Sequence, residues 1–328
     1  MAAKRGNLEM LQFAHRKGFH WDEQTCANAA RNGHFDLLKW AHENGCPWLN
    51  ESWRDNISCD AARGGHFDIL KYLHEENGCF INAYVCASAA KGGHFDILKW
   101  LVGMRCPIDE RACPGAAKGG HFEILKWLVD EGGCPIGADA CAAAAKGGHL
   151  NILIWLRERE RPCPWDDRTC ARAAAAGHVE VLKWALENGC PWNQGWHDAV
   201  LGGHLNVLKW AWENDYLQNE GLCRFAAGYG KLEILKWARA NNDCPWDAQT
   251  CAEAALAGHL DVVKWAHQHG CPWDEDTCSS CVQSGQWHLL KWAVAQGCPW
   301  NEETYDKVVH QGREDIVQCM DERRPNAD

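Results

Sequence analysis

The chain alternates between short stretches with apolar residues at helical spacing and breaks made of glycine, cysteine and proline. In residues 247–273, Leu260, Val263 and Ala266 recur every three residues, the spacing of one helix face. An alanine-rich stretch of similar length precedes them. The pattern therefore predicts a pair of short helices, helix one from residue 248 to about 256 and helix two from 259 to about 268.

Turn signals mark the ends of both predicted helices. Asp247 stands just before helix one, where its carboxylate can accept the free N–H groups of the first turn. Gly258 and Gly270 follow the two helices at places that favour a left-handed residue, and Pro272 cannot continue a helix. The same N-cap is predicted in other copies at Asp22, Asn82, Asp109, Asp166, Asn193, Asp274 and Asn301.

This helix pair recurs throughout the chain. The glycine between helix one and helix two, the repeat glycine, marks twelve copies about 28 residues apart. The repeat glycines are Gly6, Gly33, Gly65, Gly93, Gly120, Gly148, Gly177, Gly203, Gly230, Gly258, Gly285 and Gly312. One insertion, around residues 53–56, lengthens the second step. Because such short helices are not stable alone, the pairs must stack and bury a shared core.

Composition narrows the class of protein. Of the 328 residues 46% are apolar and 23% are charged, which excludes intrinsic disorder. The net charge of −11 disfavours binding of nucleic acid through its phosphates. No apolar run is long enough to span a membrane, and the N-terminus lacks the apolar stretch of a signal peptide. We expect a monomer in the cytoplasm, with the nucleus as an alternative, that binds neither nucleic acid nor membrane.

The repeat resembles the ankyrin repeat. Residues 89–101 read AAKGGHFDILKWL, close to the family core Ala-Ala-x-x-Gly-His-x-(Glu/Asp)-(Ile/Val)-(Val/Leu)-Lys-x-Leu. Residues 188–193 read NGCPWN, close to the family turn Asn-Gly-Ala-Asp-x-Asn. The match recurs over nearly the whole chain. The resemblance implies an all-α, ankyrin-like solenoid of about twelve helix pairs, with residues 1–320 as a single domain and 321–328 as a polar tail.

Two features set the repeat apart from the common ankyrin pattern. Its period is about 28 residues rather than 33, and the missing residues are those of the β-hairpin tip. We expect the hairpin tips to be reduced or absent, except at the longer second step. The Cys-Pro-Trp turn resembles the shortened ankyrin arrays of giant DNA viruses of amoebae and of some protists. Many of those viral proteins carry an F-box ahead of the repeats, and none is visible here. The chain opens inside helix one, as in a truncated or duplicated copy of a longer array.

Cysteine occupies two fixed positions of the repeat, which hold 18 of the chain's 20 cysteines. The turn cysteines follow helix two: Cys46, Cys79, Cys106, Cys134, Cys163, Cys190, Cys244, Cys271 and Cys298. The helix-one cysteines are Cys26, Cys59, Cys86, Cys113, Cys141, Cys170, Cys223, Cys251 and Cys278.

The spacing of these cysteines argues against a zinc site. Six pairs, such as Cys163 and Cys170, are seven residues apart, wider than the two to four residues usual between zinc ligands. We expect both positions to face the core as small apolar residues, with no metal, no cofactor and no disulfide. An array that binds metal or responds to redox conditions is the alternative.

Histidine and tryptophan also recur at fixed positions. Histidine follows the repeat glycine in eight copies, but Asn7, Lys231, Gln286 and Arg313 replace it in the others. Because a catalytic or metal-binding position would not vary so freely, we expect a hydrogen-bonding role at the start of helix two. Nine tryptophans lie in helix two at the position of the Lys-Trp motif, and seven more lie in the turn. We expect both sets to pack between repeats.

One position of helix one changes character along the array. It lies two residues before the repeat glycine, and it is basic in the first six copies and in none of the last six. The basic residues, called the basic stripe below, are Lys4, Arg31, Arg63, Lys91, Lys118 and Lys146. The later residues are Ala175, Leu201, Gly228, Leu256, Gln283 and His310. A cation at the end of a helix also favours the helix dipole, which is the alternative explanation.

These observations favour a binding protein over an enzyme. The sequence has no phosphate loop, no serine-nucleophile motif and no His-Glu-x-x-His, so we expect no catalytic activity. A solenoid offers an extended surface, and the resemblance implies binding of a partner protein on the concave helix-one face. We predict that the basic stripe, roughly 50 Å long at a helix spacing of about 8–10 Å, attracts an acidic segment of that partner. A viral or host-directed adaptor in the host cytoplasm is the corresponding biological role.

Overall fold

The computed structural model describes residues 2–47, 57–193, 195–217, 221–242 and 244–323. In these residues all regular structure is helical and no strand is formed, as the sequence predicts. The predicted insertion at residues 53–56, and with it the hairpin tip expected at that step, lies outside the described residues. The last part of the predicted tail, residues 324–328, lies outside them as well.

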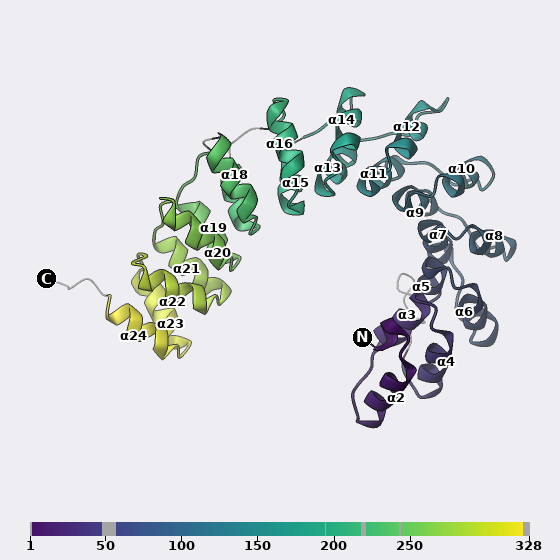
Figure 1. The fold of residues 1–328 in the computed structure, drawn as a ribbon, viewed down its shortest axis with the longest axis horizontal. Coiled ribbons are helices and arrows are strands. Elements are labelled where there is room, and N and C mark those ends of the chain that lie inside the picture. The colour runs from purple at the N-terminus through teal and green to yellow at the C-terminus, as the bar shows by residue number, and fades with distance from the viewer. Residues whose placement is uncertain (1, 48–56, 194, 218–220, 243, 324–328) are drawn as a thin grey trace. The chain divides into compact units, whose positions relative to one another are not determined.

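The helices follow one another in twelve pairs within the described part of the chain (Figure 1). The helix-one members are α1 (Ala2–Arg5), α3 (Glu23–Arg31), α5 (Ile57–Gly64), α7 (Ala83–Gly92), α9 (Ala112–Gly119), α11 (Ala138–Gly147), α13 (Asp167–Ala175), α15 (Trp196–Gly202), α17 (Leu222–Gly228), α19 (Ala248–Leu256), α21 (Glu275–Ser284) and α23 (Glu302–His310). The helix-two members are α2 (Leu8–Arg16), α4 (Phe35–Glu43), α6 (Phe67–Lys71) with the π-helical turn η1 (Tyr72–Glu76), α8 (Phe95–Gly103), α10 (Phe122–Asp130), α12 (Leu150–Glu158), α14 (Val179–Glu187), α16 (Leu205–Glu213), α18 (Leu232–Asn242), α20 (Leu260–Gln268), α22 (Trp287–Ala295) and α24 (Glu314–Asp321).

The chain divides into two compact bodies. The N-terminal body comprises Met1–Ala173 and Glu180–Trp192, and the C-terminal body comprises Ala174–Val179 and Asn193–Asp328. In the N-terminal body, helices α3, α5, α7, α9 and α11 line the inner side of a curved stack, with α4, α6, α8, α10 and α12 outside them (Figure 1). In the C-terminal body, α17, α19 and α21 pack in succession. One continuous domain over residues 1–320 stays a prediction.

Small side chains let the helix-one members of successive repeats approach closely. Most of them carry two adjacent small residues just before the repeat glycine, such as Ala89 and Ala90 in α7, which are both fully buried. Helix two contributes the largest buried side chains of the core, for example Leu98 in α8 and Leu125 in α10, which are also fully buried. Burial of an apolar side chain of this size contributes about 1.5–3 kcal/mol. Stacking therefore supplies the stability that the single helices lack.

Most predicted N-caps form. Asp247 accepts the backbone N–H of Thr250 at 3.2 Å, and the Thr250 hydroxyl accepts the N–H of Asp247, which completes a capping box. Asn82 and Asn301 also accept a first-turn N–H. The prediction is wrong at Asn193, because α15 begins only at Trp196 and Gly195 takes the N-cap position. Glycine is a poor helix former, and here it delays the start of the helix. The prediction is also wrong at Asp109, because α9 begins at Ala112 and Arg111 takes the N-cap position, and Asp22 takes the predicted position without a capping hydrogen bond from its side chain.

The recurring tryptophans pack both within and between repeats, as predicted. Within a repeat, the turn tryptophan meets the helix-two tryptophan edge to face, as in the pair Trp165 and Trp184 at a centroid distance of 5.9 Å. Between repeats, the first aromatic residue of one helix two meets the tryptophan of the next, as in Phe95 and Trp127 at 5.4 Å. Edge-to-face contact at this distance is the favoured geometry of aromatic pairs. The outer helices are therefore joined by a continuous series of ring contacts in the N-terminal body.

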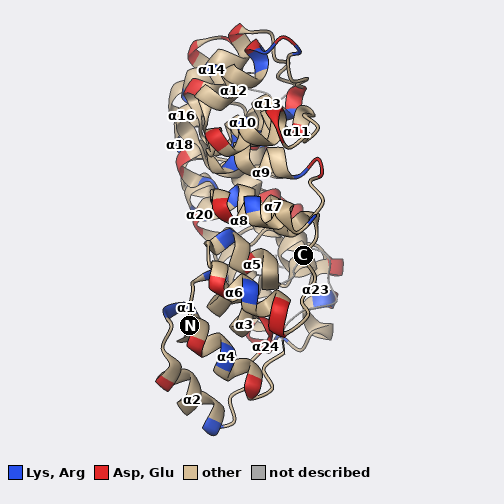
Figure 2. Cartoon of the chain, turned by 90° about the vertical axis from the view of Figure 1, so that its right-hand side faces the viewer, with Lys and Arg blue, Asp and Glu red and all other residues tan. Residues whose placement is uncertain are grey.

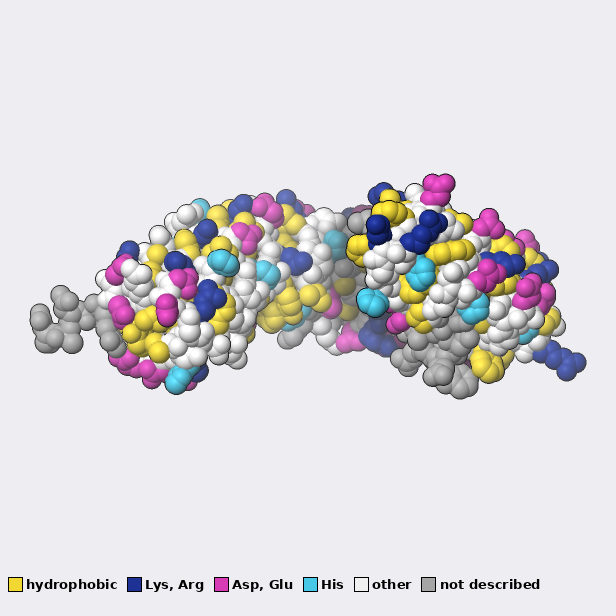
Figure 3. Space-filling model, turned by 90° about the horizontal axis from the view of Figure 1, so that it is seen from below, with side chains coloured by type: hydrophobic (Ala, Val, Ile, Leu, Met, Phe, Trp, Pro, Cys, Tyr) yellow, Lys and Arg dark blue, Asp and Glu magenta, His cyan; other side chains and the backbone are white. Residues whose placement is uncertain are grey.

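The surface is mixed in character. On the face drawn in Figure 3, apolar side chains are interspersed with charged and polar ones. No described helix is both long and apolar enough to cross a lipid bilayer. The largest exposed fractions of apolar side chains include Phe19 at 68% and Phe80 at 71%, and both stand in the turns that follow helix two.

The two ends of the array should open first. Helix α1 has only four residues, and in the last repeat Arg313, Gln318 and Cys319 replace the common histidine, lysine and tryptophan. Segments with few packing partners open at lower free energy. We expect amide hydrogen exchange to be fastest before about Gly33 and after about Gly312, measured by mass spectrometry of peptides from the intact chain. Uniform protection from end to end would contradict this expectation.

Candidate interaction surface

A hydrogen bond from the recurring histidine joins the end of helix one to the next repeat at five places in the N-terminal body. The ring Nε2 of His94 lies 3.0 Å from the backbone carbonyl oxygen of Arg63. The same contact recurs between His121 and Lys91 at 3.1 Å, and its counterparts are His34 to Lys4, His66 to Arg31 and His149 to Lys118. Because a carbonyl oxygen only accepts, Nε2 must carry the proton. This confirms the hydrogen-bonding role predicted for the histidines.

The repeat glycine provides the room for this histidine ring. At Gly93, whose φ is +85°, an added Cβ would lie 2.4 Å from the ring of His121. All twelve repeat glycines have positive φ, the left-handed region predicted at the end of helix one. We call this contact of glycine, histidine and carbonyl the histidine seam. It holds the helix-one face of each repeat in a fixed position against its neighbour.

The seam carbonyls belong to the residues of the basic stripe. Each stripe residue in the described contacts offers its backbone oxygen to a histidine, while its side chain extends from the end of helix one. Lys4, Arg31, Arg63 and Lys146 are exposed, and Lys91 and Lys118 are half-buried. All six residues fall in the N-terminal body. The structure thus gathers the predicted basic residues on one row of successive helices.

The side chains of the stripe repel one another. Partial burial and the charges of Arg63, Lys118, Lys146 and Arg31 hold the pKa of Lys91 below its ordinary value. Burial, Lys146, Arg172 and Arg63 lower the pKa of Lys118 in the same way. Desolvation and nearby like charges both disfavour the charged form of a lysine. The stripe residues therefore create a positive electrostatic potential, and none of them carries a negative charge that would reduce it.

Neighbouring side chains neutralise only one end of the stripe. Arg31 forms an ion pair with Asp60, which lies on the next helix one. Among the ion pairs of the described residues, none includes Arg63, Lys91, Lys118 or Lys146. At the place equivalent to Asp60 on the helices that follow Arg63, Lys91 and Lys118 stand Ser88, Gly115 and Ala143, and Arg172 stands there after Lys146. In the described part of the chain, this position therefore offers none of these four cations a carboxylate.

The helix-two face carries a different charge pattern. Red and blue residues alternate along α4, α6 and α8 in Figure 2, which views that side of the N-terminal body. Lys71 and Lys99 lie over the rings of Phe67 and Phe95, at 4.6 and 4.1 Å from the ring centroids. These lysines are already partnered, in contrast to the stripe lysines.

Sequence reasoning missed two members of this surface. Arg172 contributes to the positive field at Lys118, and Asp60 pairs with Arg31. Both stand five residues before a repeat glycine, one helical turn from the stripe position. Reading that second position along the repeat would have identified both residues.

In the C-terminal body the stripe position is apolar from Leu201 to Leu256, before Gln283 and His310, and a cavity opens beside it. Leu201 and Leu256 are exposed at the stripe position, and Gly228 stands between them in the sequence order of the repeats. A cavity of about 420 Å³ opens at α17. Its lining residues are Gly221, Arg224, Phe225, Gly228, Tyr229 and Glu253. The two charged lining residues pair with each other, Arg224 to Glu253 at 2.7 Å, so the apolar rings dominate the hollow.

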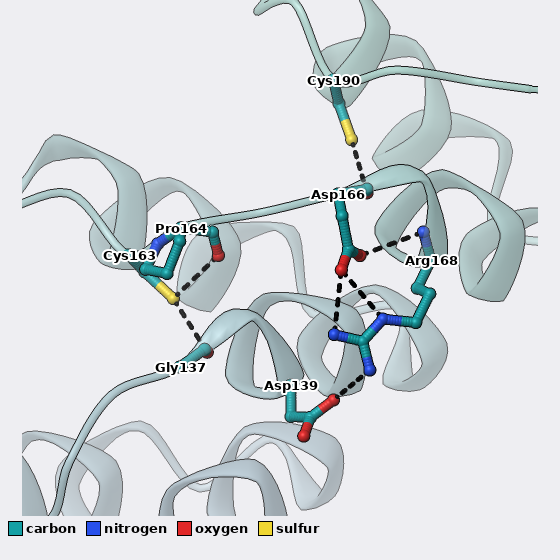
Figure 4. Close-up of polar contacts among 7 residues, drawn as sticks. All are labelled: Gly137, Asp139, Cys163, Pro164, Asp166, Arg168 and Cys190. Carbon is teal, nitrogen blue, oxygen red and sulfur yellow. Dashed lines mark hydrogen bonds and ion pairs between the residues drawn. The ribbon is translucent and has the colours of Figure 1, made fainter.

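The cysteines occupy core positions, as predicted. All are buried except Cys319, which is partly exposed. Seven turn cysteines lie close to a backbone carbonyl just before helix one of their own repeat, as Cys163 does to Gly137 at 3.3 Å and Cys190 to Asp166 at 3.4 Å (Figure 4). Figure 4 also shows Arg168 between Asp166 and Asp139. Within the described residues, no three His, Cys, Asp or Glu side chains are placed to hold a metal ion.

The histidine seam should make stability depend on pH. Burial holds the pKa of His121 below its ordinary value, more than the bond to the Lys91 carbonyl raises it. The unfolded chain then binds more protons, so stability is lost as the pH falls through the ordinary histidine value of about 6.5. We expect the urea midpoint to fall between about pH 7.5 and about pH 5.5. In the variant His121→Gln this fall should be smaller, and an unchanged slope would contradict the assignment.

Comparison with known proteins agrees with this architecture. A family model described as ankyrin repeats (many copies) matches residues 1–42 and 86–129. The first stretch covers α1, α2, α3 and most of α4, and the second covers α8, α9 and most of α7 and α10. No curated protein matches the chain. The matched segments and the helix pairs that repeat around them together support an ankyrin-repeat protein.

Proposed function

We propose that the chain is a protein-interaction scaffold whose N-terminal body binds an acidic segment of a partner protein along the basic stripe. Ankyrin repeats generally mediate interactions between proteins, which gives the broad class. The proposal of an acidic segment rests on one observation. Four neighbouring cations, Arg63, Lys91, Lys118 and Lys146, have no acidic partner among the described residues. Carboxylates of a partner would relieve their mutual repulsion.

The chain's own net charge sharpens this proposal. The molecule carries −11 overall, so a positive row stands against an acidic background. An acidic segment is therefore repelled by most of the surface and attracted at the stripe, which favours one binding register. The apolar hollow at Phe225 and Tyr229 would bind an uncharged part of a partner. In biological terms, we propose that the chain acts as a viral or host-directed adaptor in the cytoplasm.

The test uses a fluorescently labelled glutamate-rich peptide as the acidic probe. One variant reverses the stripe, with Arg63→Glu, Lys91→Glu and Lys118→Glu. The matched control reverses the helix-two lysines of the same three repeats, with Lys71→Glu, Lys99→Glu and Lys126→Glu. Both variants change the net charge equally. We expect the stripe variant to lose more than about tenfold in affinity at low salt, and the control to lose much less.

Salt dependence provides the second measurement. Binding to the unmodified chain should weaken as salt rises, because the screening length falls to about 8 Å near 0.15 M. The stripe variant should lose this dependence. Equal losses in the two variants would show that only net charge matters and would overturn the proposal. Tighter binding of a single-stranded oligonucleotide of equal charge, lost in the same stripe variant, would assign the stripe to nucleic acid instead.

A further inference from the structure

The two cysteine positions come together inside eight of the repeats. The Sγ atoms of Cys86 and Cys106 lie 2.8 Å apart, although the two residues are 20 positions apart in the sequence. In seven other repeats, the helix-one and turn cysteines also interact through their side chains. These pairs are Cys26 with Cys46, Cys113 with Cys134, Cys141 with Cys163, Cys170 with Cys190, Cys223 with Cys244, Cys251 with Cys271, and Cys278 with Cys298.

The fold explains why these residues meet. The helix-one cysteine stands in the first turns of helix one, and the turn cysteine follows helix two, so the helix hairpin returns the chain to the same end. The partner seven residues away, as Cys113 is from Cys106, belongs to the next repeat. The spacing visible in the sequence therefore differs from the pairing in the fold.

The two members of a pair are not equivalent. In the pair Cys86 and Cys106, the helix-one thiol donates to the turn sulfur, which in turn lies 3.1 Å from the carbonyl oxygen of Asn82. The hydrogen bond with Cys86 lowers the pKa of the Cys106 thiol, while the pKa of Cys86 is raised. Cys106 is 7% exposed and Cys86 is fully buried. In this pair the turn cysteine is thus the one that an oxidant from solvent reaches first.

We propose that each such pair is an oxidation site that closes to a disulfide within its own repeat when the chain meets a peroxide. In the first step the turn thiolate attacks hydrogen peroxide, an S–O bond forms, the O–O bond breaks and hydroxide leaves. In the second step the helix-one sulfur attacks the resulting sulfenic acid. The S–S bond forms, and the thiol proton and the hydroxyl leave as water. The peroxide is reduced and two thiols are oxidised.

The geometry requires little movement for this step. A disulfide has an S–S length of about 2.05 Å, so the sulfurs of Cys86 and Cys106 need to approach by less than about 1 Å. The closed bond ties the start of helix one to the turn after helix two and encloses a loop of about one helix pair. Such a cross-link restricts the unfolded chain, so the oxidised array should resist urea more than the reduced one.

The experiment titrates the intact, reduced chain with hydrogen peroxide. Remaining thiols are then alkylated, and a proteolytic digest is mapped by mass spectrometry without reduction. We expect linked peptides that join Cys86 to Cys106, Cys113 to Cys134 and Cys170 to Cys190, each lighter by two hydrogen atoms than the sum of its parts. Dithiothreitol should reverse the links, and the oxidised chain should show a higher urea midpoint.

Two variants sharpen the result. In Cys106→Ala, Cys86 should stay open to alkylation after unfolding, while the other pairs still close. The control Cys319→Ala removes a cysteine outside the pairs and should lose none of the links. Links between residues seven apart, such as Cys106 with Cys113, would overturn the proposal. So would overoxidised turn cysteines without links, or pairs that stay reduced when Cys319 is oxidised.

Discussion

Replacing Gly93 by alanine is expected to lower the free energy of unfolding by about 3 kcal/mol. Two costs add at this position. The φ of +85° is strained for any residue with a Cβ, at about 1–2 kcal/mol. The new methyl group would also lie 2.4 Å from the ring of His121, which must move and give up its bond to the Lys91 carbonyl. Urea unfolding followed by circular dichroism measures the loss.

Gly45 provides the matched control. Its φ of +83° is almost the same, but an added Cβ there meets no atom within 4 Å. The variant Gly45→Ala should therefore show the backbone cost alone, about 1–2 kcal/mol. In a His121→Ala background, Gly93→Ala should cost no more than this control, since the ring is gone. Equal losses for Gly93→Ala and Gly45→Ala in the unmodified chain would refute the seam as a close-packed joint.

Truncating a core leucine should lower the free energy of unfolding by a similar amount, but it should also change the shape of the urea transition. Leu125 in α10 is fully buried, so Leu125→Ala should cost about 3 kcal/mol through lost apolar contact and the cavity left behind. Because each repeat packs only on its neighbours, a weakened repeat in the middle should let the repeats before it and the repeats after it unfold separately. We expect the urea transition to broaden and its slope to fall, as well as its midpoint.

The control for this variant is Leu256→Ala. The Leu256 side chain is 38% exposed at the end of α19, and its truncation should change stability by less than about 0.5 kcal/mol. A single sharp transition for Leu125→Ala, with the slope of the unmodified chain, would argue that the array unfolds as one unit. A loss as large in Leu256→Ala would argue against the assigned burial.

The helix pairs were predictable because the signals that define them are local. The interval from residue 248 to 256 predicted for helix one matches α19, and the start of α20 differs from the prediction by one residue. Glycine, alanine and the N-cap act within one or two turns, so a single sequence reveals them. Asn193 and Asp109 are exceptions, since the helices that follow them begin later than predicted, at Trp196 and Ala112.

The surface and the pairings were less predictable because they depend on how repeats stack. The ion pair of Arg31 with Asp60 joins residues 29 positions apart, and it forms only because α3 and α5 lie side by side. The sulfur contact of Cys86 with Cys106 likewise depends on the helix hairpin that brings distant residues together. The stripe itself was visible, since a fixed position in every repeat must fall on one row.

The histidine seam makes the boundary between repeats interchangeable. At two of the copies that replace the histidine, the substitute still reaches the preceding repeat glycine: an added Cβ at Gly258 would meet the amide of Gln286 at 2.6 Å, and one at Gly203 would meet Lys231 at 3.6 Å. A repeat that ends in this glycine and begins its second helix with such a side chain therefore fits after any other. Genes for such a chain can gain or lose whole repeats by unequal recombination without disturbing the contact between neighbouring repeats. The length of the array and of the basic stripe can therefore evolve independently of the stability of each repeat.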